Sequence, residues 1–258
     1  MAERVGAAAI TAAIEGSDGP ALCAYVTAGF PSPAAFPDVL RSVVAAADLV
    51  EIGVPFTDPM ADGLTIQTSN RVALRAGVTL GWVFELLEAS IIETPTLLMG
   101  YYNPFLAHGL EDLGASLVRS GVSGLIVPDL PFEESGPIRQ VLDPHGLALV
   151  QMVAPTTPPD RLRWLAAAGT GFVYAVTTTG VTGRRVDLES DDLEYLGRVK
   201  RAATLPVLAG FGIRSRRQVE AVAGVVDGVI VGSALIEVIE RGEDPGAFLE
   251  ALRSKVPA

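Results

Sequence analysis

Glu51 interrupts the apolar run of residues 48–55, which begins with Asp48. In a β-strand, side chains alternate between the two faces, so Glu51 would point away from the face that carries Ile52 and Val54. A carboxylate buried there is costly to ionise, and burial raises its pKa towards neutrality, where it can transfer a proton. We interpret Glu51 as a candidate acid–base group. A structural glutamate held by hydrogen bonds is the alternative.

Further carboxylates follow that run. Asp58 and Asp62 lie in residues 55–63, where two prolines and a glycine predict a shaped loop rather than a helix. Either residue alone fits a turn or a helix cap as well as chemistry. Across a cavity from Glu51, one of them could accept an N–H or stabilise positive charge. Asp129, in the later stretch Pro-Asp-Leu-Pro, fits a carboxylate that orients a loop.

Three glycine-rich turns follow apolar runs late in the chain: residues 180–183, 210–213 and 232–234. Glycine lets a backbone approach an anion, and helix N-termini bind phosphate through free N–H groups. Gly212, Gly232 and the Ser233 hydroxyl are therefore candidates for a phosphate site that needs no lysine. The Arg184–Arg185 pair could reach a phosphate, but a solvated loop is an equal alternative.

Scarce residue types narrow the chemistry further. Only two of the 19 basic residues are lysines, Lys200 and Lys255, and neither lies in a pocket-like segment, which disfavours an imine mechanism. The two histidines, His108 and His145, are expected in solvated connections and lack the spacing of metal ligands. With a single cysteine, Cys23, the chain has few ligands for zinc, and we expect no metal. A lone cysteine also requires no oxidising compartment.

These residues need a scaffold, and the sequence predicts one. Eight short apolar runs begin near residues 21, 48, 94, 124, 147, 171, 205 and 228, with amphipathic stretches such as 34–47, 80–92 and 214–224 between them. Continuous hydrophobicity is typical of strands buried on both faces of a parallel sheet. Eight such units in this length predict an α/β fold, a (βα)8 TIM barrel, as one domain over residues 1–258. A doubly wound sheet is the rival, but no Gly-x-Gly-x-x-Gly follows the first run.

Two features of spacing refine this picture. The intervals after the second and sixth runs, 46 and 34 positions, exceed the others, which predicts long loops there at the active face. Residues 6–14 are apolar without a basic segment before them, so an extra N-terminal helix fits better than a signal peptide.

Tyr174 lies on the same face of its predicted strand as Phe172 and Val176. This favours core packing or pocket lining over acid catalysis.

The composition of the chain indicates which partners are unfavourable. Hydrophobic residues make up 49% and the formal net charge is −11, so a large core is available and nucleic acid or an anionic membrane is an unfavourable partner. No apolar run approaches the roughly 20 residues that span a bilayer. We expect a cytoplasmic protein.

The assembled motifs resemble the tryptophan synthase α subunit. The similarity is carried by residues 51–63 (Glu-Ile-Gly-Val-Pro-Phe-Thr-Asp-Pro-Met-Ala-Asp-Gly) with Ile66-Gln67, and continues in the same order to residue 236. The later matching motifs are 101–104 (Tyr-Tyr-Asn-Pro), 128–131 (Pro-Asp-Leu-Pro), 153–156 (Val-Ala-Pro-Thr), 180–183 (Gly-Val-Thr-Gly), 210–213 (Gly-Phe-Gly-Ile) and 231–234 (Val-Gly-Ser-Ala).

This resemblance implies cofactor-free cleavage of indole-3-glycerol phosphate to indole and glyceraldehyde 3-phosphate. It implies that Glu51 is proton donor and acceptor, and that Asp62 accepts the indole N–H. The remaining positions that it assigns hold the phosphate or line the pocket: Tyr174, Thr182, Gly183, Phe211, Gly212, Gly232 and Ser233, the last two at a short helix after the eighth strand.

The resemblance also implies a partner, a pyridoxal-phosphate β subunit in an α2β2 complex, with Asp58 and Pro59 near its surface. Leu64, Gly100 and Arg184 depart from the usual family residues, and all bear on loop closure and coupling. Two alternatives stay open: a stand-alone lyase that releases free indole, and a noncatalytic barrel that activates a β-type enzyme by docking.

Overall fold

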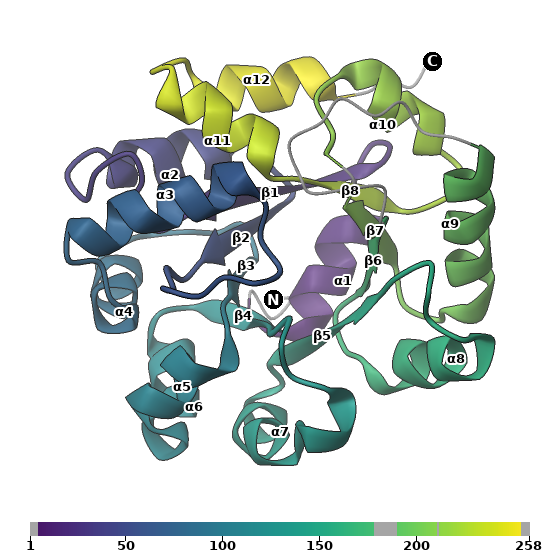
Figure 1. The fold of residues 1–258 in the computed structure, drawn as a ribbon, viewed down its shortest axis with the longest axis horizontal. Helices are drawn as coiled ribbons and strands as arrows, with labels where there is room; N and C mark the ends of the chain where they lie inside the picture. Colours follow the sequence, from purple (N-terminus) through teal and green to yellow (C-terminus); the bar gives the residue numbers. More distant parts are fainter. Residues whose placement is uncertain (1–4, 178–189, 211, 254–258) are drawn as a thin grey trace.

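The computed structural model describes residues 5–177, 190–210 and 212–253, and these form a closed barrel of eight parallel strands in sequential order (Figure 1). The predicted TIM barrel is confirmed. The strands are β1 (Ala21–Thr27), β2 (Leu49–Gly53), β3 (Thr96–Met99), β4 (Val122–Ile126), β5 (Ala148–Val153), β6 (Val173–Val176), β7 (Val207–Gly210) and β8 (Gly228–Val231). Each lies within one of the predicted apolar runs or begins a residue or two from its start, because every strand is covered on both faces.

Helices surround the barrel as an outer ring (Figure 1). They are α2 (Phe36–Ala46), α3 (Leu64–Arg75), α4 (Leu80–Glu88), α5 (Tyr102–His108), α6 (Leu110–Arg119), α7 (Gly136–Leu142), α8 (Pro159–Ala168), α9 (Ser190–Ala202), α10 (Arg216–Val222), α11 (Ser233–Glu240) and α12 (Pro245–Leu252). The extra length after β2 is predicted to be a loop, and residues 80–92 a helix. The helix α4 confirms the second prediction, but the extra length holds both the loop of residues 54–63 and the helix α3.

The predicted N-terminal helix, α1 (Ala7–Glu15), closes one end of the barrel. Ile10 and Ile14 are buried against the side chains of the barrel interior, and the Thr11 hydroxyl donates to the carbonyl of Gly171, which precedes β6. Residues before β5 and β6 lie at the N-terminal ends of the strands. The opposite end, where the strands run out, is therefore the open one.

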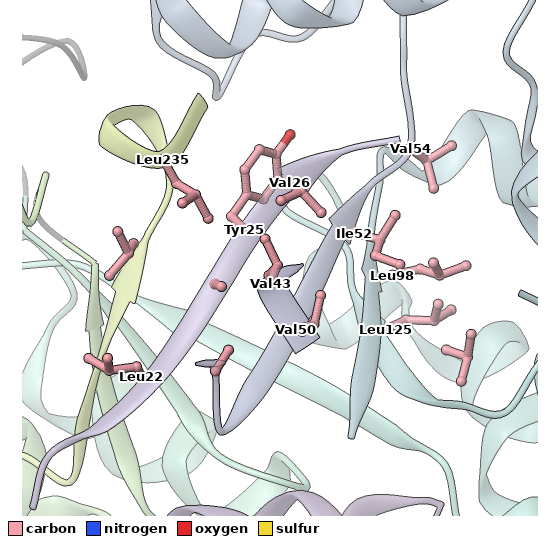
Figure 2. Packing of buried hydrophobic residues seen from close by; sticks show 14 of the residues in the cluster. Leu22, Tyr25, Val26, Val43, Val50, Ile52, Val54, Leu98, Leu125 and Leu235 are labelled. Atoms are coloured by element: carbon pink, nitrogen blue, oxygen red, sulfur yellow. The ribbon is translucent and has the colours of Figure 1, made fainter. Parts of the chain in front are cut away.

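Alternation along the strands divides the core into two layers. Val50, Ile52 and Val54 pack outward with the helices, as the labelled side chains around β2 and β3 show (Figure 2). Leu49 and Leu97 point inward with residues of α1. Since Leu49 and Glu51 are two positions apart, Glu51 lies on the inner side, as its parity predicts.

Two expectations outside the barrel have different outcomes. The prediction of a solvated His108 is wrong: its ring contacts Phe84 with 5.0 Å between centroids, and Nε2 lies 3.1 Å from Ser116 Oγ. Asp129 Oδ1 accepts the Tyr102 N–H at 2.9 Å, so this carboxylate orients the start of α5, as predicted. Across the described part of the chain, each helix is too short or too polar to span a bilayer.

Candidate active site

Glu51 is fully buried on β2, inside the barrel. Neither of its carboxyl oxygens has a hydrogen-bond partner among the described residues. Burial, and secondarily the charge of Asp62, raises the pKa of Glu51 to about 8. The carboxyl group therefore carries a proton at neutral pH and can donate it. The alternative of a hydrogen-bonded structural glutamate has no support within the described residues.

Asp62 lies at the end of the loop that follows β2, and two side chains of α3 hold it. The Asn70 side chain donates to Asp62 Oδ2 at 3.2 Å, and Gln67 Nε2 donates to the Asp62 carbonyl at 2.8 Å. Burial raises the pKa of Asp62 to about 6, against a lowering by Asn70. Asp62 is thus mostly ionised at neutral pH. Because its charge acts on Glu51, the two carboxyl groups form one electrostatic unit.

Tyr101 fixes the loop that carries Asp62, and sequence reasoning assigned it no role. Its hydroxyl accepts the Ala61 N–H at 2.8 Å, and its ring stacks on Phe56 with centroids 5.1 Å apart. Tyr101 follows β3, the neighbour of β2, so the two strand ends bring the ring to the loop. The alternation of side chains along β3 does not predict this contact, because the contact depends on the path of the loop.

Two tyrosines on the inner side of the barrel pack closely over glycines of the neighbouring strands. A Cβ atom on Gly53 would lie 2.1 Å from the Tyr25 hydroxyl, and one on Gly210 would lie 2.8 Å from the Tyr174 ring. Burial, followed by nearby carboxylates, raises the pKa of both phenols well above the ordinary value. Both phenols therefore stay neutral at physiological pH. The Tyr174 ring lies 6.3 Å from that of Phe172, and its role in lining a substrate pocket stays a prediction. Sequence reasoning missed Tyr25, although it shares the inward parity of Cys23.

The predicted phosphate residues that the structure describes lie on two neighbouring strand ends. Gly212, with a φ of +71°, follows β7, and Gly232 directly follows β8. Ser233 is the first residue of α11, is 5% exposed, and the helix has no side-chain cap. The free N–H groups of that helix end suit an anion. Thr182, Gly183 and Phe211, as well as the Arg184–Arg185 pair, lie outside the described residues.

Asp58 and Pro59 lie at the tip of the Asp62 loop. Asp58 is exposed and accepts a 2.5 Å hydrogen bond from the Thr57 hydroxyl. Met60 beside them is 87% exposed, and Leu64 at the start of α3 is 66% exposed. The tip of the loop thus exposes a charged side chain, Asp58, next to an apolar one, Met60. No three metal-ligating side chains cluster anywhere in the described ranges.

A (βα)8 barrel with two electrostatically coupled carboxyl groups of different pKa is typical of a barrel enzyme of acid–base chemistry. A sequence profile described as tryptophan synthase alpha chain matches residues 12–255. Curated proteins of that name from Solidesulfovibrio magneticus and Geobacter sulfurreducens are 44% and 41% identical over 236 and 245 residues, which are 90% and 92% of this chain and 92% and 93% of theirs.

Solved structures agree. Tryptophan synthase from Mycobacterium tuberculosis superposes with a TM-score of 0.88 at 35% identity, covering 97% of each chain. A structure of the α2β2 complex from Pyrococcus furiosus gives 0.84 at 34% identity, covering 91% of this chain and 98% of that one.

The chain belongs to the tryptophan synthase alpha chain family. It is a carbon–carbon lyase of tryptophan biosynthesis that cleaves indole-3-glycerol phosphate, and it works without a cofactor of its own.

Proposed function

We propose that Glu51 and Asp62 carry this cleavage as a proton donor and a charged acceptor. The observation behind the proposal is the difference in protonation between these two carboxyl groups. Glu51, with no partner among the described residues and a pKa of about 8, holds its proton at neutral pH, while Asp62, with a pKa of about 6, has mostly lost its own. When two carboxyl groups in one site have different pKa values, one can donate a proton while the other is already an anion.

The reaction proceeds through the indole ring. Glu51 donates its proton to the ring carbon that bears the glycerol chain, and the ring nitrogen becomes positively charged. Asp62 accepts the N–H of that nitrogen and stabilises the charge. Glu51, now a carboxylate, takes the proton of the adjacent glycerol hydroxyl. The carbon–carbon bond breaks, its electron pair returns to the ring, and the products are indole and the aldehyde glyceraldehyde 3-phosphate.

The remaining predicted residues bind the substrate in this proposal. The phosphate meets the N–H groups at Gly212, Gly232 and Ser233, supported by their neighbouring strand ends and the uncapped start of α11. Tyr174 lines the indole pocket from β6. The assignment of Thr182, Gly183 and Phe211 to substrate binding is supported by the family resemblance alone.

We further propose a cytoplasmic α2β2 assembly in which a pyridoxal-phosphate β subunit receives the indole. The family includes a solved α2β2 complex, and the tip at Asp58 and Pro59 carries the exposed apolar side chain of Met60. Exposed apolar surface at a loop tip is typical of a docking surface.

The test measures indole release from indole-3-glycerol phosphate by wild type, Glu51→Gln and Asp62→Asn, each with and without a β subunit. General acid–base catalysis contributes about 100- to 10,000-fold, so E51Q should lose at least 1,000-fold in kcat, with binding of indole-propanol phosphate retained. D62N should lose about 100-fold. Unchanged turnover by E51Q would refute the assignment.

The same assay separates the partner alternatives. A rise of orders of magnitude on adding the β subunit supports a coupled synthase subunit. Fast release by the chain alone supports a stand-alone lyase. Absence of any release, with or without the β subunit, would leave the noncatalytic barrel.

A further inference from the structure

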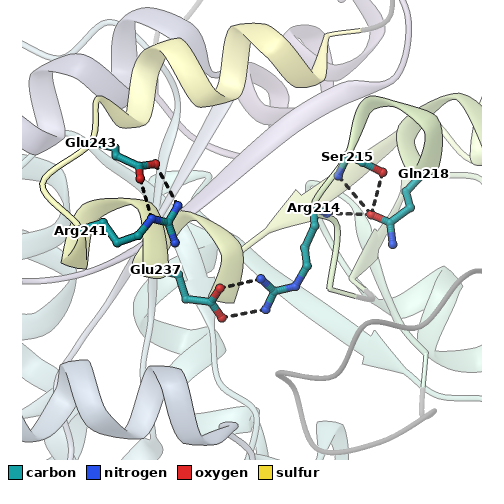
Figure 3. A network of polar contacts seen from close by, with 6 residues as sticks. All are labelled: Arg214, Ser215, Gln218, Glu237, Arg241 and Glu243. Carbon is teal, nitrogen blue, oxygen red and sulfur yellow. Dashed lines mark hydrogen bonds and ion pairs between the residues drawn. The ribbon is translucent and has the colours of Figure 1, made fainter.

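An ion pair joins the two elements that carry the proposed phosphate site. Arg214 lies two residues after Gly212, and Glu237 lies on α11, four residues after Ser233. The Arg214 guanidinium donates to both Glu237 oxygens, at 2.6 and 2.7 Å (Figure 3). Both side chains are only about a quarter exposed, at 25% and 29%. A bidentate pair of this kind fixes orientation as well as distance.

Both ends of this ion pair are anchored. The Arg214 N–H donates to Gln218 Oε1 at 2.8 Å, which ties the residue to the capping box that begins α10. The hydrogen bonds from Arg214 are the main cause that lowers the pKa of Glu237. The charge of Arg241 adds a smaller lowering, and the Thr65 hydroxyl of α3 one that is smaller still. The pair therefore links the loop after β7 and α11, and its carboxylate also reaches the helix that follows the Asp62 loop.

Glu237 lies where its negative charge, if unpaired, would oppose phosphate binding. Residues four apart on a helix share a face, so Glu237 lies about one turn, roughly 6 Å, beyond the N-terminal N–H groups at Ser233. An unpaired carboxylate there would repel a phosphate bound at that end. The guanidinium cancels this charge while it holds the loop in place.

We propose that the Arg214–Glu237 pair is a positioning device for the substrate phosphate. It holds the Gly212 loop and the start of α11 at the spacing that a phosphate bridges, and it neutralises the carboxylate beneath the anion. This inference rests on the proposed phosphate site. Neither residue touches the reacting atoms, so both are positioning residues rather than catalytic ones.

The experiment uses the full chain and three variants: Arg214→Met, the double variant R214M/E237Q, and Arg216→Met. Arg216→Met is a matched control. It removes the same charge close by, but Arg216 pairs with Glu220 within α10 and does not bridge two elements. The readouts are KM and kcat for indole-3-glycerol phosphate, the inhibition constant of inorganic phosphate, and the binding of indole alone. Circular dichroism and thermal unfolding check that each variant folds.

R214M should raise KM and the inhibition constant of phosphate about tenfold, with kcat within threefold of wild type and indole binding unchanged. R216M should change each value less than twofold. Adding Glu237→Gln to R214M should recover part of the phosphate affinity, because it removes the uncompensated charge. A generally loosened structure would instead weaken phosphate binding further in the double variant.

Unchanged phosphate inhibition in a folded R214M, or a double variant weaker than R214M, would overturn the proposal. Should R214M fail to fold, Arg214→Lys, which keeps the charge but not the bidentate bridge, takes its place. A threefold rise in the inhibition constant of phosphate is then expected, and an unchanged constant would overturn the proposal. Failure of the proposed function is distinguishable, since it appears as the absence of indole release or of phosphate inhibition in the wild type.

Discussion

Glu51 should make the chain less stable as pH rises, and its replacement by glutamine should remove that loss. In the folded chain burial raises the pKa of Glu51 from 4.5 to about 8. Below pH 4.5 both folded and unfolded chains carry the neutral acid, so no difference arises. Between these values the unfolded chain ionises and the folded chain does not, which lowers the free energy of unfolding until pH reaches about 8.

The size of this effect follows from the two pKa values. At about 1.4 kcal/mol for each pKa unit, the full penalty above pH 8 is on the order of 5 kcal/mol, and about 3 kcal/mol is already present at pH 7. A glutamine has no charge to desolvate in either state. E51Q should therefore gain on wild type by about 3 kcal/mol between pH 5.5 and pH 9. The same substitution that abolishes turnover should stabilise the fold.

Urea unfolding of both proteins at half-unit pH steps measures this difference. The slope against pH is the diagnostic, because any contact that glutamine makes or loses shifts the difference by the same amount at every pH. Glu85→Gln is a suitable control, since Glu85 is an exposed carboxylate on the outer helix α4. Parallel pH curves for wild type and E51Q would show that Glu51 is ionised and compensated in the fold, and would refute its assignment as a proton donor.

Three further outcomes are expected. A plot of kcat/KM against pH should be bell-shaped, with apparent pKa values near 6 and 8. Asn70→Ala should raise only the lower of the two, by roughly half to one unit, because it removes a hydrogen bond to Asp62 that is worth about 1 kcal/mol. Tyr101→Phe should lower kcat/KM about fivefold by freeing the Ala61 N–H, and full activity in that variant would argue against a role in holding the loop. Gly210→Ala should raise KM about tenfold and cost about 1–3 kcal/mol in urea unfolding, because the new methyl meets the Tyr174 ring; an unchanged KM would show that the ring does not line the substrate pocket.

The parts of this structure that the sequence predicts are those set by local periodicity. Apolar runs identify the strands because each strand is buried on both faces, and alternation along β2 is enough to place Glu51 inside the barrel. The interval after β2 correctly indicates extra residues. It does not distinguish a loop from α3, because the residues that this helix buries are small or polar: Ser69, Asn70 and Ala73.

The parts that the sequence does not predict are contacts between distant segments. Tyr101 and Ala61 are 40 positions apart, and Arg214 and Glu237 are 23 apart. Each contact depends on how a loop bends over the end of a strand, which no periodic pattern encodes. The same holds for the half-buried His108, whose contact with Phe84 depends on the packing of α4 beside α5. Chemistry-bearing residue types are thus visible early, while the residues that hold them in place emerge only from the fold.

Glu51 lies on a strand of the barrel, whereas Asp62 lies on a loop. A partner protein could therefore affect the two carboxyl groups differently. Glu51 is held by the hydrogen-bond ladder of β2 between β1 and β3, so its surroundings, and the pKa that follows from them, belong to the barrel itself. Asp62 instead depends on the side chains of Tyr101, Asn70 and Gln67, and lies three residues from the exposed tip at Pro59. A protein bound at that tip would act on Asp62 through one short segment and leave Glu51 untouched. Docking should therefore change charge stabilisation at the indole nitrogen more than the supply of the proton.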